Sequence, residues 1–373
     1  MRTFERACLH DFLDERIIFR DLNPLDSNLA RLDDIRTKLH LPDDMVPRKT
    51  SPEYARVIAY LLEMASHNDG KKNAIETIIY IGDTCMNDGK AFHNICSAGN
   101  WRGIAMITSE ENELTKLGLE KEYHSLLFTN NHWVNLRVLK ALAQMKGIEI
   151  DERSAILIDV DKTALGARGR NDTVIDNVRI AAAQRTLNDI LHGSFSPKEF
   201  QRIYRVLNQP LFHPFTADNQ DFLVYICMIV MCKLFKLDDL QTAAQLHMLS
   251  DFHGFLQQVD QRKNELPAEA RSVHKQVLEL VQIGDSTPFK QFRQAEYFNT
   301  VQHMGQLPDD APIETMLQEE IVITREVMEF ALESRSAGAL VFGLSDKPVE
   351  ASVPRQPAGL LPLHQVQTHV IGE

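Results

Sequence analysis

Three short runs of apolar residues constrain the fold of this chain most strongly. They are ETIIYIG at 76–82, AILIDV at 155–160 and ALVFGLS at 339–345. Each run is nearly continuous in apolar residues rather than alternating, which is typical of parallel strands buried on both faces of a sheet. Helical patterns separate the runs, so the sequence predicts an α/β fold with a doubly wound parallel sheet.

Weaker patterns extend this prediction. GIAMIT at 103–108 and THVIG at 368–372 could be further strands. Residues 131–146 favour a helix, because apolar side chains recur near helical spacing at Val134, Val138, Leu142 and Met145.

The character of the chain changes between about residues 167 and 335, where strand-like runs vanish and helical patterns continue. We therefore predict that 167–335 is a separate all-helical domain, inserted into an α/β core made of 1–166 and 336–373. Its hinges should lie near 164–172 and 333–338. The stretch 346–366 is rich in Pro, Gly and Ala and should be mostly loop.

Composition narrows the class of protein. The 373 residues carry a net charge of −12, which argues against a nucleic-acid backbone as the main partner. Five cysteines without a CxxC pair, and a charged N-terminal stretch without a signal-peptide pattern, favour a reducing cytoplasm. The most apolar run, 222–235, is too short to span a bilayer and indicates a buried helix, so no membrane partner is expected.

Polar residues follow the three strand runs, at the edge where ligands bind to open α/β sheets. Asp159, Asp161 and Thr163 follow the second run, and Asp83 and Asp88 follow the first. Taken singly, each is typical of a helix cap or a turn. Taken together they would place several carboxylates in one crevice, and a hard cation such as Mg²⁺ would relieve their repulsion.

Two of these motifs resemble those of the haloacid dehalogenase (HAD) superfamily of phosphatases. DVDKT, with Asp159, Asp161 and Thr163, has the form of the family's DxDxT motif, and IGDTCMND has the form GDxxxxD with Asp83 and Asp88. VFGLSDKP resembles the family's strand that ends in Ser or Thr followed by Asn-Lys-Pro, with Asp346 in place of Asn.

The order of the motifs differs from the family, which runs from DxDxT through the Ser/Thr strand and a lysine to the acidic motif. Here the acidic motif comes first and the Ser345 strand comes last. A lysine at the start of a helix is found in VPRKTSPEYARVIAYLLEMA, 46–65, as Lys49. Read in a circle, the order is restored, so the sequence resembles a circularly permuted HAD domain. The helical insert stands where the family carries its C1-type cap.

The resemblance implies roles for individual residues. Asp159 would be the nucleophile, Asp161 the general acid and base, and Thr163 would position their loop. Ser345 and Lys49 would hold the phosphoryl oxygens. Mg²⁺ would bind Asp159, the backbone carbonyl of Asp161 and Asp83, with Asp88 as a ligand or just behind one. Candidates for lesser roles are Lys347, otherwise a loop lysine, and Arg168 and Arg170, which could touch a substrate anion or belong to the hinge or the cap surface.

The implied function is a Mg²⁺-dependent phosphomonoesterase that forms an aspartyl-phosphate and acts on a small phosphorylated metabolite. A phosphotransferase or phosphomutase with the same nucleophile, and a non-catalytic HAD-fold binding or regulatory protein, are the alternatives. Substrate identity and oligomeric state stay open. The permuted fold predicts adjacent parallel strands ending at Gly82, Ile158 and Leu344, with the Asp159 strand in the middle. A strand at Thr368–Ile371 should then flank the Ser345 strand at the outer edge.

Overall fold

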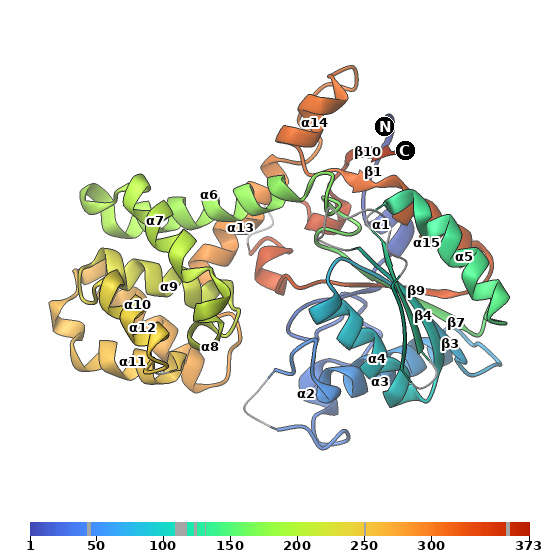
Figure 1. Cartoon of the computed structure of the whole chain (residues 1–373), viewed down its shortest axis with the longest axis horizontal. Coiled ribbons are helices and arrows are strands. Elements are labelled where there is room, and N and C mark those ends of the chain that lie inside the picture. The colour runs from blue at the N-terminus through green and yellow to red at the C-terminus, as the bar shows by residue number, and fades with distance from the viewer. Residues whose placement is uncertain (43–45, 109–117, 123–124, 131, 250, 356–358) are drawn as a thin grey trace. The chain divides into compact units, whose positions relative to one another are not determined.

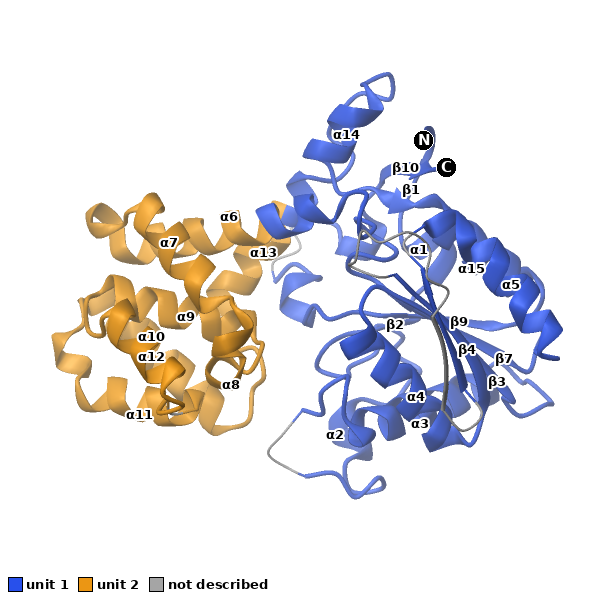
Figure 2. Cartoon of the chain, in the orientation of Figure 1, with its two compact units in different colours: residues 1–177, 300–373 blue, residues 178–299 orange. Residues whose placement is uncertain are grey.

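The computed structural model describes residues 1–42, 46–108, 118–122, 125–130, 132–249, 251–355 and 359–373. It divides into two compact units, coloured separately in Figure 2. Residues 1–177 and 300–373 form an α/β unit, and residues 178–299 form a helical unit.

The α/β unit is built on a seven-stranded sheet with the order β2-β9-β7-β3-β4-β6-β5 (Figure 1). Six of these strands are parallel, and β5 runs antiparallel to β6. Across the sheet the strands are β2 Ile17–Ile18, β9 Leu340–Leu344, β7 Ser154–Asp159, β3 Thr77–Gly82, β4 Arg102–Thr108, β6 Ser125–Asn130 and β5 Gly118–Glu122.

The three central strands confirm the prediction from the apolar runs. β3, β7 and β9 are buried along their whole length, and β7 lies between the other two. Ile81 pairs with Ile158, and Asp159 pairs with Leu344, so the three strands end at nearly the same level. The residues that follow them are therefore gathered at one edge of the sheet.

Helices cover both faces of this sheet (Figure 1). On one face, α3 (Pro52–Asn68) and α4 (Lys90–Gly99) pack on alternate residues of the central strands. On the other face lie α1 (His10–Leu13), α5 (Leu136–Met145) and α15 (Arg325–Ser336). The short helix α2 spans Leu32–Ile35. The start of α3 agrees with the sequence, because the hydroxyl of Ser51 accepts a hydrogen bond from the Tyr54 amide and Pro52 is the first helical residue.

The helix predicted at 131–146 exists, but its predicted apolar face is wrong. Val138 is 40% exposed and Met145 is 81% exposed. The buried side chains are Leu136, Leu139 and Ala143. A tight 3₁₀ turn at Trp133–Asn135 precedes the α-helix, so Val134 is out of phase with the residues that follow it.

A second, three-stranded sheet has the order β1-β10-β8, with β1 Arg2–Ala7, β10 Thr368–Gly372 and β8 Ile323–Thr324. The strand predicted at 368–372 is confirmed as β10, but its predicted place is wrong. It pairs with β1 and β8, whereas β2 flanks β9 in the main sheet. The two-residue β2 is too short to be recognised as an apolar run.

The helical unit has the all-helical character expected of the insert, with narrower bounds than 167–335. Residues 300–335 belong to the α/β unit, because α15 packs against β7 and β9, and β8 pairs with β10. The helix α9 (Gln220–Met231) is buried almost all round, as predicted for 222–235. The others between α5 and α15 are α6 Asp172–Leu191, α7 Pro197–Leu207, α8 His213–Thr216, α10 Leu237–Gln245, α11 Phe252–Gln261, α12 Ala268–Gln282, α13 Lys290–Gln302 and α14 Ile313–Glu319.

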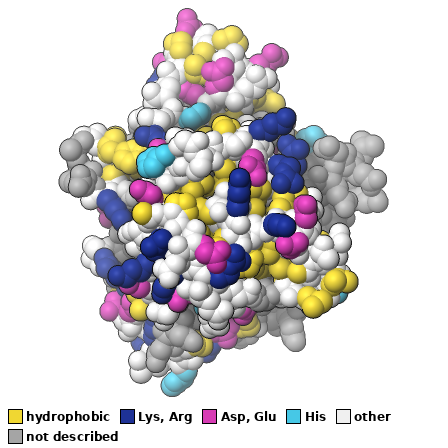
Figure 3. Space-filling model, turned by 90° about the vertical axis from the view of Figure 1, so that its left-hand side faces the viewer, with side chains coloured by type: hydrophobic (Ala, Val, Ile, Leu, Met, Phe, Trp, Pro, Cys, Tyr) yellow, Lys and Arg dark blue, Asp and Glu magenta, His cyan; other side chains and the backbone are white. Residues whose placement is uncertain are grey.

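No helix among the described residues is long and apolar enough to cross a membrane. Figure 3 shows a mixed surface on one face of the molecule, where basic and acidic side chains are interspersed with exposed hydrophobic ones. The described part of 346–366 is loop apart from two 3₁₀ turns, Val349–Ala351 and Leu363–Gln365, which confirms the prediction for that stretch.

Candidate active site at the carboxyl ends of the central strands

The chain turns tightly after β7, in a segment of residues 159–165 that we call the Asp159 loop. The amide of Ala164 donates to the carbonyl of Asp159, and the amide of Leu165 donates to the carbonyl of Val160. Lys162 takes a left-handed conformation with φ of 65° to complete the turn. This closed loop holds the carboxylate of Asp159 at the strand end, where it is 1% exposed.

A second turn follows β3 and brings Asp88 back against the strand. One short π-helix, Cys85–Gly89, forms this turn. The Oδ2 atom of Asp88 accepts hydrogen bonds from the amides of Asp83 and Thr84, at 3.1 and 2.9 Å. A Cβ atom at Gly82 would lie 2.6 Å from the Asp88 side chain, so the glycine of the GD motif is required for this close approach.

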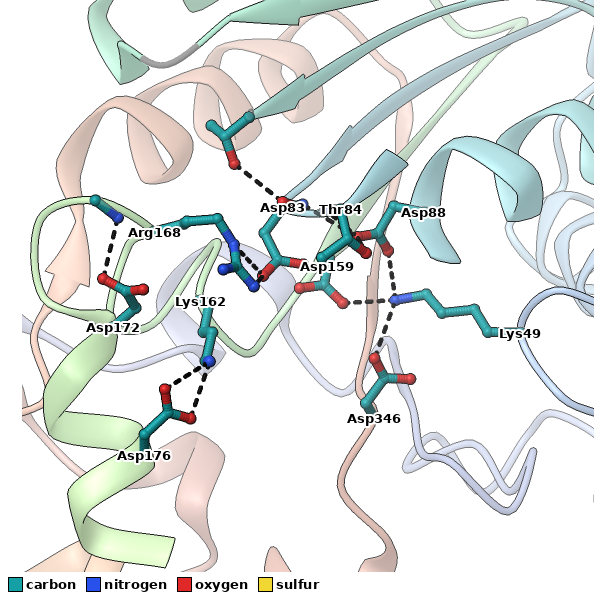
Figure 4. Close-up of polar contacts among 12 residues, drawn as sticks. Lys49, Asp83, Thr84, Asp88, Asp159, Lys162, Arg168, Asp172, Asp176 and Asp346 are labelled. Carbon is teal, nitrogen blue, oxygen red and sulfur yellow. Dashed lines mark hydrogen bonds and ion pairs between the residues drawn. The ribbon is translucent and has the colours of Figure 1, made fainter. Parts of the chain in front are cut away.

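Lys49 joins these two loops from a position 110 residues before Asp159 (Figure 4). Its Nζ atom lies 2.6 Å from Asp159 Oδ1 and 2.6 Å from Asp88 Oδ1. A third carboxylate, Asp346 Oδ2, is 3.6 Å away. Lys49 is 8% exposed, so the predicted approach of this lysine to Asp159 is present and the pairing is buried.

Of the two residues after β9, Ser345 contributes less directly than expected and Lys347 more directly. The hydroxyl of Ser345 accepts a hydrogen bond from the Lys347 amide at 3.1 Å, and within the described residues it is not hydrogen-bonded to Lys49 or Asp159. Lys347 is buried rather than a loop lysine, and its Nζ lies 2.8 Å from Asp161 Oδ1. The sequence offered one signal for this contact, since Lys347 also follows a strand that ends beside β7.

The two arginines of the GARGR stretch have different partners. Arg168 contacts Asp83 Oδ2 through Nε at 2.8 Å and Nη2 at 2.5 Å. In Figure 4 the carboxylates of Asp83, Asp88 and Asp159 lie between Arg168 and Lys49. Arg170 instead forms a two-pronged ion pair with Glu326, with both N–O distances at 2.9 Å. Arg170 therefore ties the chain before α6 to α15 and is engaged away from the carboxylates.

Burial and mutual repulsion shift the pKa values of these carboxyl groups. Burial, reinforced by the charge of Asp88, raises the pKa of Asp83 to about 7 although Arg168 opposes the shift. Burial likewise raises the pKa of Asp159 well above its ordinary value, against the effect of Lys49. Burial would raise the pKa of Asp88 too, but Lys49 outweighs it and lowers that pKa to about 2. The cluster thus holds more negative charge than its environment accommodates.

The donor set fits a divalent cation. One oxygen from each of Asp83, Asp88 and Asp159 lies within 4.8 Å of the other two. The Oδ2 atom of Asp159 is buried and has no hydrogen-bond partner in the described part of the chain. Five carboxylates (Asp83, Asp88, Asp159, Asp161 and Asp346) meet three cationic side chains (Lys49, Arg168 and Lys347), so the cluster has two more acidic than basic groups. Oxygen ligands and this excess suit Mg²⁺.

Thr163 and Asp161 also have unsatisfied atoms. Thr163 is fully buried, and its carbonyl accepts a hydrogen bond from the Thr324 hydroxyl at 2.5 Å. Within the described residues, the Thr163 hydroxyl and Asp161 Oδ2 are buried without partners. Because buried polar atoms are rarely left unpaired, a water molecule or a polar ligand would complete the hydrogen bonding of these atoms.

The chain matches no protein-family model, and comparisons with curated proteins and with solved structures likewise give no match.

Proposed function

We propose that this chain is a Mg²⁺-dependent phosphomonoesterase of the HAD type, which acts on a small phosphorylated metabolite through an aspartyl-phosphate on Asp159. The contact of Lys49 with Asp159 and Asp88 carries the proposal. The motif order predicted that a lysine 110 residues before Asp159 would lie next to this carboxylate. Lys49 Nζ is 2.6 Å from Asp159 Oδ1. Lysine side chains are rarely buried unless they are paired, so a lysine buried among carboxylates is unlike an ordinary surface lysine.

The two carboxylates of the Asp159 loop support distinct roles. In Asp159, Lys49 occupies Oδ1, and Oδ2 has no partner in the described chain. In Asp161, Lys347 occupies Oδ1, and Oδ2 is similarly without a partner. We assign the reacting oxygen of each residue to its Oδ2 atom, because the lysine contact engages the other oxygen and fixes the carboxylate.

The chemistry then has two steps. Asp159 Oδ2 attacks phosphorus, the bond from phosphorus to the leaving oxygen breaks, and Asp161 gives that oxygen a proton. Water then attacks the aspartyl-phosphate while Asp161 takes its proton. The bond between phosphorus and Asp159 breaks, and inorganic phosphate leaves. Lys49 faces the phosphoryl oxygens in both steps and stabilises their negative charge.

Asp83, Asp88 and Asp159 would hold Mg²⁺, together with the Asp161 carbonyl that the resemblance implies. When bound, the ion would neutralise charge on the phosphoryl oxygens and let a dianionic ester enter an acidic site.

The order of the strands supports the permuted arrangement of the motifs. β9, β7 and β3 lie side by side, with the Asp159 strand in the middle, although they occur in the order β3, β7, β9 along the chain. The helical unit is inserted between β7 and β9, where we propose that it serves as the cap. Closure of such a cap would exclude water from the reacting groups.

One observation favours the non-catalytic alternative. Both Nε and Nη2 of Arg168 rest on Asp83 Oδ2, an oxygen that a metal would otherwise bind. With Asp83 engaged by Arg168, the site would lack one of its metal ligands, as expected of a binding or regulatory protein.

Phosphate release from p-nitrophenyl phosphate, with Mg²⁺ and with EDTA, tests the proposal. The wild type should be active only with Mg²⁺, and Asp159→Asn should lower the rate by roughly 10³-fold or more, as expected for loss of a covalent nucleophile. Asp69→Asn is the matched control, since Asp69 caps the far end of the 17-residue α3 whose start follows Lys49. Full activity of Asp159→Asn, or equal activity in EDTA, would contradict the assignment.

A further inference from the structure

Arg20 presents a buried guanidinium edge that has no acceptor. It lies in the turn after β2, where the Leu22 amide donates to the Phe19 carbonyl. Its Nε and Nη2 atoms are buried and have no hydrogen-bond partner among the described residues. Leaving part of a cationic group buried and unpaired is costly, so this edge calls for a ligand.

Nε and Nη2 together form the side of a guanidinium that binds planar anions through two parallel hydrogen bonds. The same protein uses this edge elsewhere. Arg262 presents Nε and Nη2 to the two carboxylate oxygens of Glu265, at 2.9 and 2.7 Å. Arg168 presents the same two atoms to Asp83. At Arg20 the same pair of donors is buried with nothing to accept from them.

The turn that carries Arg20 lies at the same end of the sheet as the Asp159 loop. β2 runs parallel to β9, with Ile18 opposite Leu344. Beyond that pair, the Arg20 amide donates to the Lys347 carbonyl at 3.1 Å. The Lys347 amine in turn contacts Asp161. Two hydrogen bonds therefore link the Arg20 backbone to the proposed general acid.

Other unsatisfied atoms accompany this edge. Eight buried side-chain atoms lack a partner in the described chain, and three of them belong to the Asp159 loop. The other five are His10 Nδ1, Arg20 Nε, Arg20 Nη2, Asp21 Oδ1 and Ser352 Oγ. Ser352 follows the 3₁₀ turn after Lys347, and its carbonyl accepts from the Leu363 amide. Unsatisfied polar atoms thus occur both in the Asp159 loop and around Arg20, whose backbone is bonded to Lys347.

We infer that Arg20 binds a second anionic group of the substrate, a carboxylate or a phosphate, while the phosphoryl group reacts at Asp159. This inference rests on the proposed function for the reaction, but the anion site itself is carried by Arg20. It narrows the substrate class to phosphate esters with a further negative charge, and it assigns the discrimination against neutral esters to one side chain.

Two matched pairs of substrates test the inference. Phospholactate differs from isopropyl phosphate by a carboxylate in place of a methyl group, and propanediol bisphosphate differs from propanediol monophosphate by a phosphate. In at least one of these two pairs, the wild type should have a kcat/KM about tenfold or more higher for the more anionic ester. Arg20→Met should abolish that preference, while kcat/KM for isopropyl phosphate and for p-nitrophenyl phosphate should stay within about twofold of the wild-type values. Arg20→Lys should keep part of the preference. Arg16→Met is the control, because Arg16 precedes β2 and pairs with Asp69.

Thermal unfolding without ligand gives a second readout. Removing a buried guanidinium edge that has no partner should leave the melting temperature of Arg20→Met unchanged or higher. A lower melting temperature would mean that Arg20 pairs with a protein group such as Asp21, and it would overturn the inference. Equal kcat/KM within both pairs, or an Arg20→Met variant that keeps the preference, would also overturn it and leave the proposed phosphatase intact.

Calorimetric binding of the preferred anionic ester to Asp159→Asn protein separates the two proposals. Suppose that no ester is hydrolysed, but adding Arg20→Met to the Asp159→Asn protein weakens binding of the ester at least about tenfold. The proposed phosphatase activity would then be wrong, and the anion site at Arg20 would be supported. If neither anionic ester binds in an Arg20-dependent way, the anion site fails whatever the activity.

Discussion

Replacing Lys49 by methionine should destabilise the α/β unit more than any single surface substitution. The amine lies 2.6 Å from two carboxylate oxygens, and the side chain is 8% exposed. At an effective dielectric constant of about 20, each contact is worth roughly 6 kcal/mol of Coulomb energy, and desolvation of the lysine offsets much of it. Removing one partner of a buried pair leaves the others uncompensated, which typically costs about 3–5 kcal/mol.

Tryptophan fluorescence can follow this loss in one unit alone. The only two tryptophans, Trp101 and Trp133, both lie in the α/β unit and are 6% and 2% exposed. For a unit of this size, a loss of about 3–5 kcal/mol lowers the melting temperature by roughly 10 °C. As a control, replacing the exposed Lys90 by methionine should change the melting temperature by no more than about 1–2 °C.

A double variant sharpens the test. Adding Asp88→Asn to Lys49→Met removes a carboxylate that has lost its cation, so the combined loss should be smaller than the sum of the single losses. Mg²⁺ should restore part of the stability of Lys49→Met, since it replaces the missing positive charge. A Lys49→Met protein that melts with the wild type would refute the view that Lys49 holds these carboxylates together.

Two further predictions concern the arginines before α6. Burial would raise the pKa of Glu326, but hydrogen bonding and charge from Arg170 outweigh it and hold that pKa below its ordinary value of 4.5. A lowered carboxyl pKa contributes stability above about pH 4.5 that is lost as the pH falls through the folded-state value. Glu326→Gln should therefore cost about 1–3 kcal/mol at pH 7, and urea melts should show the difference from wild type shrinking below about pH 4.5. Arg168→Met should lower the Mg²⁺ concentration for half-maximal phosphate release by roughly threefold to tenfold, because it removes a cation that competes for Asp83. A higher Mg²⁺ requirement would mean instead that Arg168 supports the metal site.

The parts of the fold that follow from local pattern were predictable. Continuous apolar runs give β3, β7 and β9, because a strand buried on both faces has no polar side to interrupt it. Ser51 and Pro52 indicate the start of α3, since they satisfy the first turn of a helix. The carboxylates of Asp83, Asp88 and Asp159 could be placed together from the strand ends alone.

The features that the sequence did not reveal depend on tertiary pairing. β2 has only two residues, and nothing local distinguishes Ile17 and Ile18 from a buried loop. The contact of Lys347 with Asp161 spans 186 residues, and although their strands end side by side, no motif indicated which loop side chain would pair with Asp161. The bounds of the helical unit shifted inward for the same reason, because the packing of α15 on the sheet assigns that helix to the α/β unit.

The central position of β7 has a consequence for how the chain is made. Its sequence, SAILID, gains its first neighbour from β3, which is synthesised earlier. Its second neighbour, β9, emerges only after the whole helical unit has been translated. During that interval an apolar strand has one open edge, and such edges pair readily with other chains. The same insertion that separates the Asp159 strand from β9 therefore lengthens the time during synthesis in which this apolar edge is open.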